Sequence, residues 1–167
     1  MYDVMILGGG PAGRTAALYC ARSALRCVVL EGTPGGQMAL TQHVDNYPGL
    51  PDADGFALAQ KMREQAQRAG AEFVAHTAES VSLADGSREE LALDGLFVAI
   101  GRVPETGLFS EVEQDARGYL KADETTRTNL HGVFAAGDVR TKPLRQIVTA
   151  VADGAVSALA AEKFLRH

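Results

Sequence analysis

The first thirty residues alternate between short apolar runs and a helical pattern. Residues 2–7 are rich in β-forming types and apolar except for Asp3, and an alanine-rich run at 14–23 follows a cluster of glycines. Residues 27–30 form a second apolar run of strand length. Because a strand, a helix and a second strand in this order usually pack as a parallel pair covered by the helix, the pattern predicts a βαβ unit and an α/β fold.

The same alternation continues along the chain. Apolar residues at helical spacing predict a helix over 56–69, followed by a strand at 72–75. Two more apolar runs, 95–100 and 133–136, each end at a glycine and are typical of buried parallel strands. Helical spacing over 144–165, interrupted mainly by a glycine, predicts a closing helix.

Two segments lack this periodicity. Residues 33–52 carry Gly, Pro, Asn and Asp at turn frequency, which predicts a long ordered loop. Residues 79–94 contain Asp85-Gly86, a strong hairpin signal, so we expect a small antiparallel β addition there. The predicted chain is thus one domain over 1–167, with an N-terminal half (1–78), this hairpin and a C-terminal half (95–167).

Composition and charge exclude several classes of protein. With 167 residues, 46% hydrophobic and 22% charged, the chain is typical of one globular domain. A net charge of -5 without a basic run makes nucleic acid a poor partner. No apolar stretch reaches the roughly 18–20 residues that span a bilayer, and the first residues do not resemble a secretion signal. We therefore expect a cytoplasmic protein with no membrane partner.

Three glycines carry the strongest chemical signal. Gly8, Gly10 and Gly13 form G-x-G-x-x-G between a predicted strand and a predicted helix, where backbone amides and the helix N-terminus attract phosphate groups. Glu31 follows Gly13 by 18 residues at the end of the second strand, where a carboxylate accepts hydrogen bonds from a ribose diol. The same carboxylate would repel a 2′-phosphate, which favours FAD or NAD over NADP. The alternative is a glycine-rich turn without a ligand.

Several motifs together resemble the FAD-binding half of bacterial thioredoxin reductases, and they extend over nearly the whole chain. They are Gly8-Gly9-Gly10-Pro11-Ala12-Gly13, Gly35-Gly36-Gln37, Val44-Asp45-Asn46-Tyr47-Pro48-Gly49, Gly101-Arg102-Val103-Pro104-Glu105-Thr106, Val133-Phe134-Ala135-Ala136-Gly137-Asp138 and Leu144-Arg145-Gln146-Ile147. The resemblance implies a Rossmann-like FAD/NAD(P)-binding fold, with a central parallel sheet and helices, and FAD as the cofactor.

The resemblance also implies roles for individual residues. Asn46 would lie beside the flavin and Asp138 would hydrogen-bond the ribityl chain, although Asn46 alone is compatible with a turn and Asp138 with a helix cap. The segment 145–147 would approach the pyrimidine edge of the flavin, where helix N-terminal donors stabilise negative charge. The candidate cofactor-binding residues are Gly8, Gly10, Pro11, Ala12, Gly13, Glu31, Gly32, Gly35, Gly36, Gln37, Asn46, Gly101, Gly137, Asp138, Arg145, Gln146 and Ile147.

The family's NADPH-binding domain and its redox-active C-x-x-C pair are missing from this sequence. Only about a dozen residues separate Val81 from Leu96, whereas a domain needs roughly 100. Cys20 and Cys27 are predicted to be small buried hydrophobic residues without a catalytic role. His43 is the one histidine near the expected flavin, and we interpret it as a solvated loop residue.

Three functions are compatible with this sequence. The leading hypothesis is a minimal FAD-binding flavoprotein domain of the thioredoxin reductase type, in which the flavin carries the redox chemistry. The second is a flavin-dependent oxidoreductase that uses an external electron donor or partner. The third is a folded scaffold without catalytic activity. A homodimer formed through the FAD domain is the assembly that the resemblance suggests, and no metal site is expected.

Overall fold

A five-stranded parallel sheet forms the centre of the computed structural model, which describes residues 1–78, 81, 96–98 and 106–166. The strands lie in the order β3-β2-β1-β4-β5, and every neighbouring pair is parallel. Their bounds are β1 Val4–Leu7, β2 Cys27–Leu30, β3 Glu72–Val74, β4 Leu96–Val98 and β5 Val133–Ala135. The predicted parallel sheet and α/β class are confirmed.

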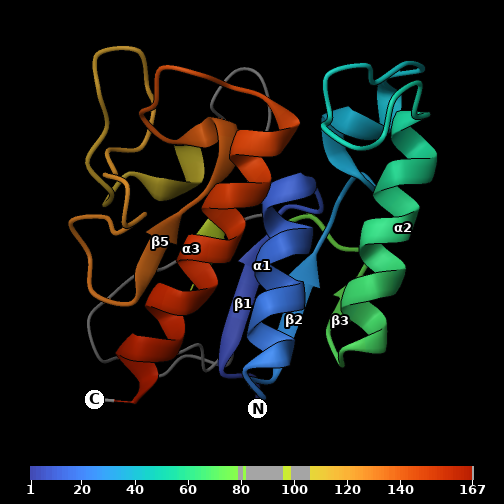
Figure 1. Ribbon diagram of the computed structural model, residues 1–167. Coiled ribbons are helices and arrows are strands. Elements are labelled where there is room, and N and C mark those ends of the chain that lie inside the picture. The colour runs from blue at the N-terminus through green and yellow to red at the C-terminus, as the bar shows by residue number, and fades with distance from the viewer. Residues whose placement is uncertain (79–80, 82–95, 99–105, 167) are drawn as a thin grey trace.

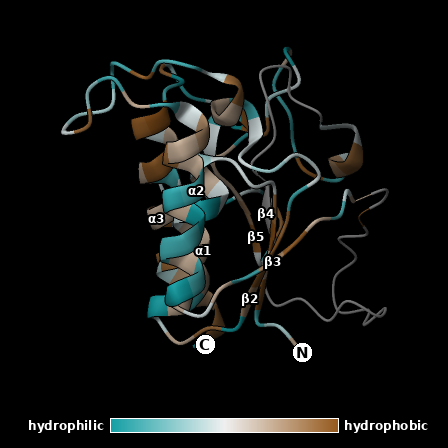
Figure 2. Ribbon diagram, turned by 90° about the vertical axis from the view of Figure 1, so that its right-hand side faces the viewer, coloured by the Kyte–Doolittle hydropathy of each residue, from teal (hydrophilic) through white to brown (hydrophobic). Residues whose placement is uncertain are grey.

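In the described part of the chain, three helices cover one face of this sheet, as Figure 2 shows. They are α1 (Pro11–Arg22), α2 (Gly55–Arg68) and α3 (Ile147–Leu165), and α1 lies between the other two (Figure 1). Val4 and Ile6 of β1 are fully buried in the cluster that α1 and α3 share. Since alternate side chains of a strand point to opposite faces, every second residue of β1 faces the helices.

The opposite face of the sheet is covered by the segment that precedes β5. Met5 and Leu7 of β1 pack there against Phe109, Val112 and Leu120. Phe109 ends the short helix η2 (Thr106–Phe109), and all three covering side chains are buried to 2% exposure or less. The covering segment has no regular hydrophobic periodicity, so the sequence pattern did not predict that it packs on the sheet.

Helix ends differ from the predictions by about three residues, for local reasons. Helix α1 begins at Pro11, because proline suits the first helical position, where no backbone N–H is needed. Helix α3 begins at Ile147, after Gln146 and Thr149 form a reciprocal capping box, and it continues through Gly154. The predicted loop at 33–52 contains the short helix η1 (Gly36–Leu40).

Some predictions fall outside the described residues, namely the hairpin at Asp85-Gly86 and the candidate site residue Gly101. Among the helices of the described ranges, none combines the length and apolar character needed to cross a membrane. The residues described also bring together no group of three or more His, Cys, Asp or Glu side chains suited to a metal ion.

Candidate dinucleotide site

A cavity of about 1020 Å³ lies where the carboxyl ends of the strands meet the following loops. Ligands of parallel α/β sheets bind at this edge, and the volume is at the upper end of the roughly 300–1,000 Å³ typical of cofactor sites. Its wall comes from the loops after β1, β2, β3 and β5 together with the start of α3. The lining residues with predicted roles are Gly8, Gly10, Pro11, Ala12, Gly32, Gly36, Gln37, Asn46, Gly137, Asp138, Arg145, Gln146 and Ile147.

The glycine motif forms the turn between β1 and α1. A Cβ atom on Gly13 would lie 2.0 Å from the carbonyl oxygen of Gly8, so only glycine lets the first turn of α1 approach β1 this closely. Gly10 is the N-cap of α1 and Pro11 follows at the first helical position. The start of α1, with its unpaired backbone donors, therefore faces the cavity at Gly10, Pro11 and Ala12.

A second turn approaches the cavity after β5. Gly137 has a φ of +83°, and Asp138 follows it within the short helix η3 (Gly137–Val139). The N-cap of α3 is Gln146, so Asp138 is not the cap of that helix. Asp138 is half-buried and lines the cavity, which is compatible with its predicted role toward a ribityl chain.

A buried carboxylate on α3 holds this turn from behind. Asp153 is 6% exposed, and its Oδ2 atom accepts a hydrogen bond from the backbone N–H of Gly137 at 2.9 Å. Arg140 donates to both carboxylate oxygens at 2.8 and 2.9 Å, and Lys142 Nζ lies 2.7 Å from Oδ2. Burial alone would raise the pKa of Asp153, but the hydrogen bonds from Arg140 and Lys142 outweigh it and hold that pKa below its ordinary value.

The two segments expected beside the flavin meet directly. Nδ2 of Asn46 donates to Oε1 of Gln146 at 2.7 Å, although the two residues are 100 positions apart. Asn46 therefore makes a long-range contact, which a turn residue does not require. The guanidinium of Arg145 lies 3.8 Å from the ring centre of Tyr119 and donates to the carbonyl oxygen of Asp138 at 3.1 Å.

Glu31 lies outside the lining residues of the cavity. Its side chain is 1% exposed, with Oε2 2.8 Å from Nη2 of Arg14 and Oε1 2.6 Å from Nη1 of Arg63. Two guanidinium groups thus face one carboxylate, which leaves a formal charge of +1 and removes the basis for the predicted repulsion of a 2′-phosphate. Direct contact of Glu31 with a ribose stays a prediction.

The remaining predicted residues, and two that were not predicted, lie as follows. Gly13 and Gly35 are not among the residues that line the cavity. His43 lines it and is exposed, as a solvated loop residue would be. His76 and Thr77 line the cavity without having been predicted, although their place directly after β3 was the available signal. Burial raises the pKa values of Cys20 and Cys27, the latter to about 11, and both thiols are free and buried as predicted.

The parallel sheet and the glycine turn at its carboxyl edge define a Rossmann-type dinucleotide-binding fold. The sequence profile described as "Pyridine nucleotide-disulphide oxidoreductase" matches residues 58–154. Since this match spans more than half of the chain, the chain belongs to the pyridine nucleotide-disulphide oxidoreductase family.

Several of the similar proteins are thioredoxin reductases. The chain is 27% identical to the thioredoxin reductase of Listeria monocytogenes over an alignment of 302 residues, which includes 100% of this chain and 95% of the relative. A "34.2 kDa protein in rubredoxin operon" of Clostridium pasteurianum is 52% identical over 79 residues, or 47% of this chain and 26% of that protein.

Solved structures show the same fold. The thioredoxin reductase of Lactococcus lactis superimposes with a TM-score of 0.86 at 22% identity, covering 99% of each chain. That of Gloeobacter violaceus gives a TM-score of 0.85 at 22% identity, over 99% of this chain and 95% of the other. The Rossmann-like class predicted from the sequence is therefore confirmed.

Proposed function

We propose that this chain is an FAD-binding flavoprotein module of the thioredoxin reductase type, without the family's NADPH-binding domain and redox-active dithiol. The observation that carries the proposal is the cavity itself. It gathers the glycine turn after β1, the segment Gly36-Gln37, Asn46, Asp138 and the start of α3 around one space, although these segments are spread over most of the chain.

The lining residues fit the parts of FAD in order. The glycine turn and the start of α1 offer backbone donors to the diphosphate. The ends of β2 and β3 line the cavity with Gly32 and Thr77, which would border the adenosine half. At the other end Asp138 would accept hydrogen bonds from ribityl hydroxyls, and Asn46 would lie beside the flavin. When bound, the flavin supplies the redox chemistry, and the protein supplies its position and electrostatic surroundings.

Two observations support the proposed absence of the NADPH-binding domain and the dithiol. They are the length of the alignment with a relative and the burial of the cysteines. The alignment with the Listeria relative is 302 residues long, 135 more than the 167 of this chain. The chain's two cysteines are both buried in the core, where burial raises their pKa values. Since the thiolate is the reactive form, neither is suited to pass electrons to thioredoxin.

A second candidate is an oxidoreductase that receives electrons from an external donor or partner. The observation in its favour is the exposure of the Asn46–Gln146 pair, which would leave the expected flavin end of the cavity open to an incoming molecule. NADPH oxidation, measured with and without thioredoxin, tests it. We expect background rates in both cases, and a rate well above background would make this second function the better one.

We propose a homodimer as the assembly, which the exposed apolar side chains along the outside of α3 support. Val148, Val156 and Leu159 are 41%, 39% and 51% exposed, and Tyr19 of the neighbouring α1 is 47% exposed. Contiguous exposed apolar surface is typical of an interaction site. Sedimentation at several protein concentrations measures the assembly directly, and a monomer at all concentrations would contradict it.

Flavin binding is tested by the absorbance spectrum of the purified protein before and after addition of FAD and desalting. We expect the flavin bands to stay with the protein at about one FAD per chain. Asp138→Ala should weaken FAD binding by roughly 10- to 100-fold, because it removes a charged acceptor worth about 1.5–3 kcal/mol. Asp123→Ala, a change of the same type at an exposed position away from the cavity lining, should bind as the unchanged protein does. A protein that takes up no FAD would refute the proposal.

A further inference from the structure

A cluster of buried charges lies directly behind the glycine turn. Arg14 of α1 and Glu31 at the end of β2 are both 1% exposed, and their side chains meet at 2.8 Å. Arg63 of α2 binds the second oxygen of Glu31 at 2.6 Å. The two guanidinium groups also lie over the ring of Phe73, at 5.9 Å and 5.1 Å from its centre.

Arg14 connects three elements around the adenosine end of the cavity. Its Nη2 atom binds Glu31, its Nη1 atom donates to the carbonyl oxygen of Ala59 in α2, and its Nε atom donates to the carbonyl oxygen of Gly9 in the glycine turn. One side chain thus ties the turn to β2 and α2. Burial lowers the pKa of Arg14, with Glu31 opposing that shift, yet a guanidinium stays charged in proteins.

The contact with Gly9 fixes the direction of a backbone donor. The carbonyl of Gly9 and the N–H of Gly10 belong to one planar trans peptide, so they point in opposite directions. Because the buried Arg14 holds the Gly9 oxygen on the inner side, the N–H of Gly10 is directed to the other side, and Gly10 lines the cavity. That N–H is one of the donors expected to bind a diphosphate.

Glu31 supports the same peptide from beneath. A Cβ atom on Gly9 would lie 2.1 Å from Oε2 of Glu31, so the carboxylate occupies the space that a side chain there would need. The ion pair therefore packs against the turn, with Gly9, Leu30 and Gly32 separating it from the cavity. A buried ion pair is by itself weak evidence for a role in stability, and this one is placed to orient the turn.

We propose that Arg14 is a positioning residue for the diphosphate of the bound dinucleotide, acting through the Gly9 carbonyl and Glu31. The inference rests on the proposed function, since it requires a dinucleotide in this cavity. The net positive charge of the Arg14–Glu31–Arg63 cluster lies just behind the turn, where it also favours an anionic ligand.

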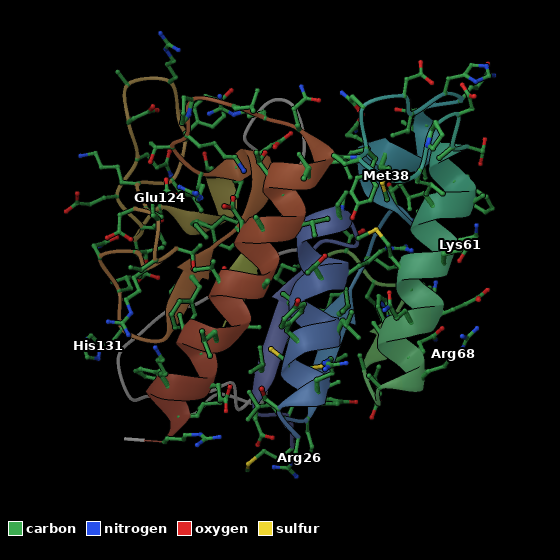
Figure 3. The ribbon with its side chains drawn as sticks, in the orientation of Figure 1. Arg26, Met38, Lys61, Arg68, Glu124 and His131 are labelled. Carbon is green, nitrogen blue, oxygen red and sulfur yellow. The ribbon has the colours of Figure 1, made fainter. Side chains whose placement is uncertain are left out.

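The test compares Arg14→Met with Arg68→Met. Arg68 lies on the outside of α2 (Figure 3), and its ion pair with Glu64 is exposed, so its substitution is the matched control. Binding of FAD and of ADP is measured by titration calorimetry on protein shown to be folded by circular dichroism. We expect Arg14→Met to weaken both ligands by about the same factor, at least tenfold, and Arg68→Met to change neither by more than twofold.

An equal loss of affinity for FAD and for ADP distinguishes a positioning role of Arg14 from a general loosening of the fold. ADP contains only the diphosphate and adenosine, so a misdirected Gly10 N–H affects ADP as much as FAD. A loosened fold would affect the flavin end too, and FAD would then lose more than ADP, which would overturn the proposal. Wild-type affinity of Arg14→Met for both ligands, within twofold, would also overturn it.

If Arg14→Met does not fold, a second variant tests the positioning role. Glu31→Gln keeps the shape of the side chain and leaves Arg14 in place, but it removes the charge that orients the guanidinium toward the carbonyl oxygen of Gly9. We expect it to weaken FAD and ADP equally, by more than twofold, whereas unchanged binding would refute the role. In a folded double variant, the loss should equal that of Arg14→Met alone. If the unchanged protein binds no FAD, it is the proposed function that fails.

Discussion

Asp153→Asn should destabilise the fold strongly, because it removes the charge at the centre of a buried ion network. The carboxylate accepts hydrogen bonds from Gly137, Arg140 and Lys142, and the side chains of the two cations are each 4% exposed. Asparagine has nearly the same shape but carries an amide donor in place of one acceptor. Both cations would then be left buried without their main counter-charge.

The size of the effect follows from that imbalance. Removing one partner of a buried ion pair costs about 3–5 kcal/mol. Arg140 keeps a contact with Glu124 at 3.6 Å, but Glu124 is 91% exposed, so this contact offsets little of the lost stabilisation. We expect a loss of about 3 kcal/mol in the free energy of unfolding, or roughly 6–12 °C in Tm for a chain of this size.

The assay is urea unfolding of the protein and of Asp153→Asn, followed by far-UV circular dichroism at several pH values. Asp52→Asn, at an exposed position, is the matched control and should stay within about 0.5 kcal/mol. Because the pKa of Asp153 is lower in the folded state, the unfolded chain binds more protons between the two pKa values. The stabilisation is therefore present above about pH 4 and is lost as the pH falls further, so the gap between protein and variant should narrow in acid.

A small effect would refute this reasoning. If Asp153→Asn unfolds within 0.5 kcal/mol of the unchanged protein at pH 7, the network does not depend on its charge. If the gap stays constant down to about pH 2, the folded-state pKa of Asp153 is not what links stability to pH.

Three further predictions concern packing and the thiols. Gly154→Ala should lower the free energy of unfolding, measured in urea, by about 1–3 kcal/mol, although alanine has the better helix propensity. The reason is that the added Cβ would lie 2.2 Å from the carbonyl oxygen of Ala12. An unchanged urea midpoint would show that α3 can move away at no cost. Leu120→Ala, at a fully buried position, should cost about 2–5 kcal/mol, and a loss under 1 kcal/mol would contradict its place in the core. Cys20 and Cys27 should resist Ellman's reagent in the native protein and react together on unfolding, whereas rapid native labelling would contradict their burial and raised pKa values.

The parallel sheet could be predicted because its evidence is local. The runs that became β2 and β5 are short and wholly apolar, as strands buried on both faces must be. The glycine spacing predicted a tight turn between β1 and α1, and that turn is present: a Cβ on Gly13 would lie 2.0 Å from the Gly8 oxygen. The start of α3 could not be predicted to the residue, because the cap formed by Gln146 and Thr149 depends on side-chain geometry that hydrophobic spacing does not record.

Pairings between distant residues could not be predicted in this way. Composition places Arg and Asp on the surface, yet Arg14 and Asp153 are buried, since each meets its counter-charge only in the folded chain. The contact between Asn46 and Gln146 spans 100 positions and has no local signature. Sequence motifs thus indicated which residues line the cavity but not what holds them.

Each of the two glycine turns that line the cavity is held by a buried ion pair. Behind Gly9 lies the Arg14–Glu31 pair, and behind Gly137 lies the Asp153–Arg140 pair, and in each case one charged side chain binds a backbone group of the turn itself. Such contacts are useful in glycine turns, because glycine loses more backbone freedom on folding than any other residue and needs contacts that fix its conformation. Since apolar packing cannot fix the direction of a peptide group, buried ion pairs that bind a carbonyl or an N–H are suited to that task. The same logic predicts that substitutions in either pair affect cofactor binding as well as stability.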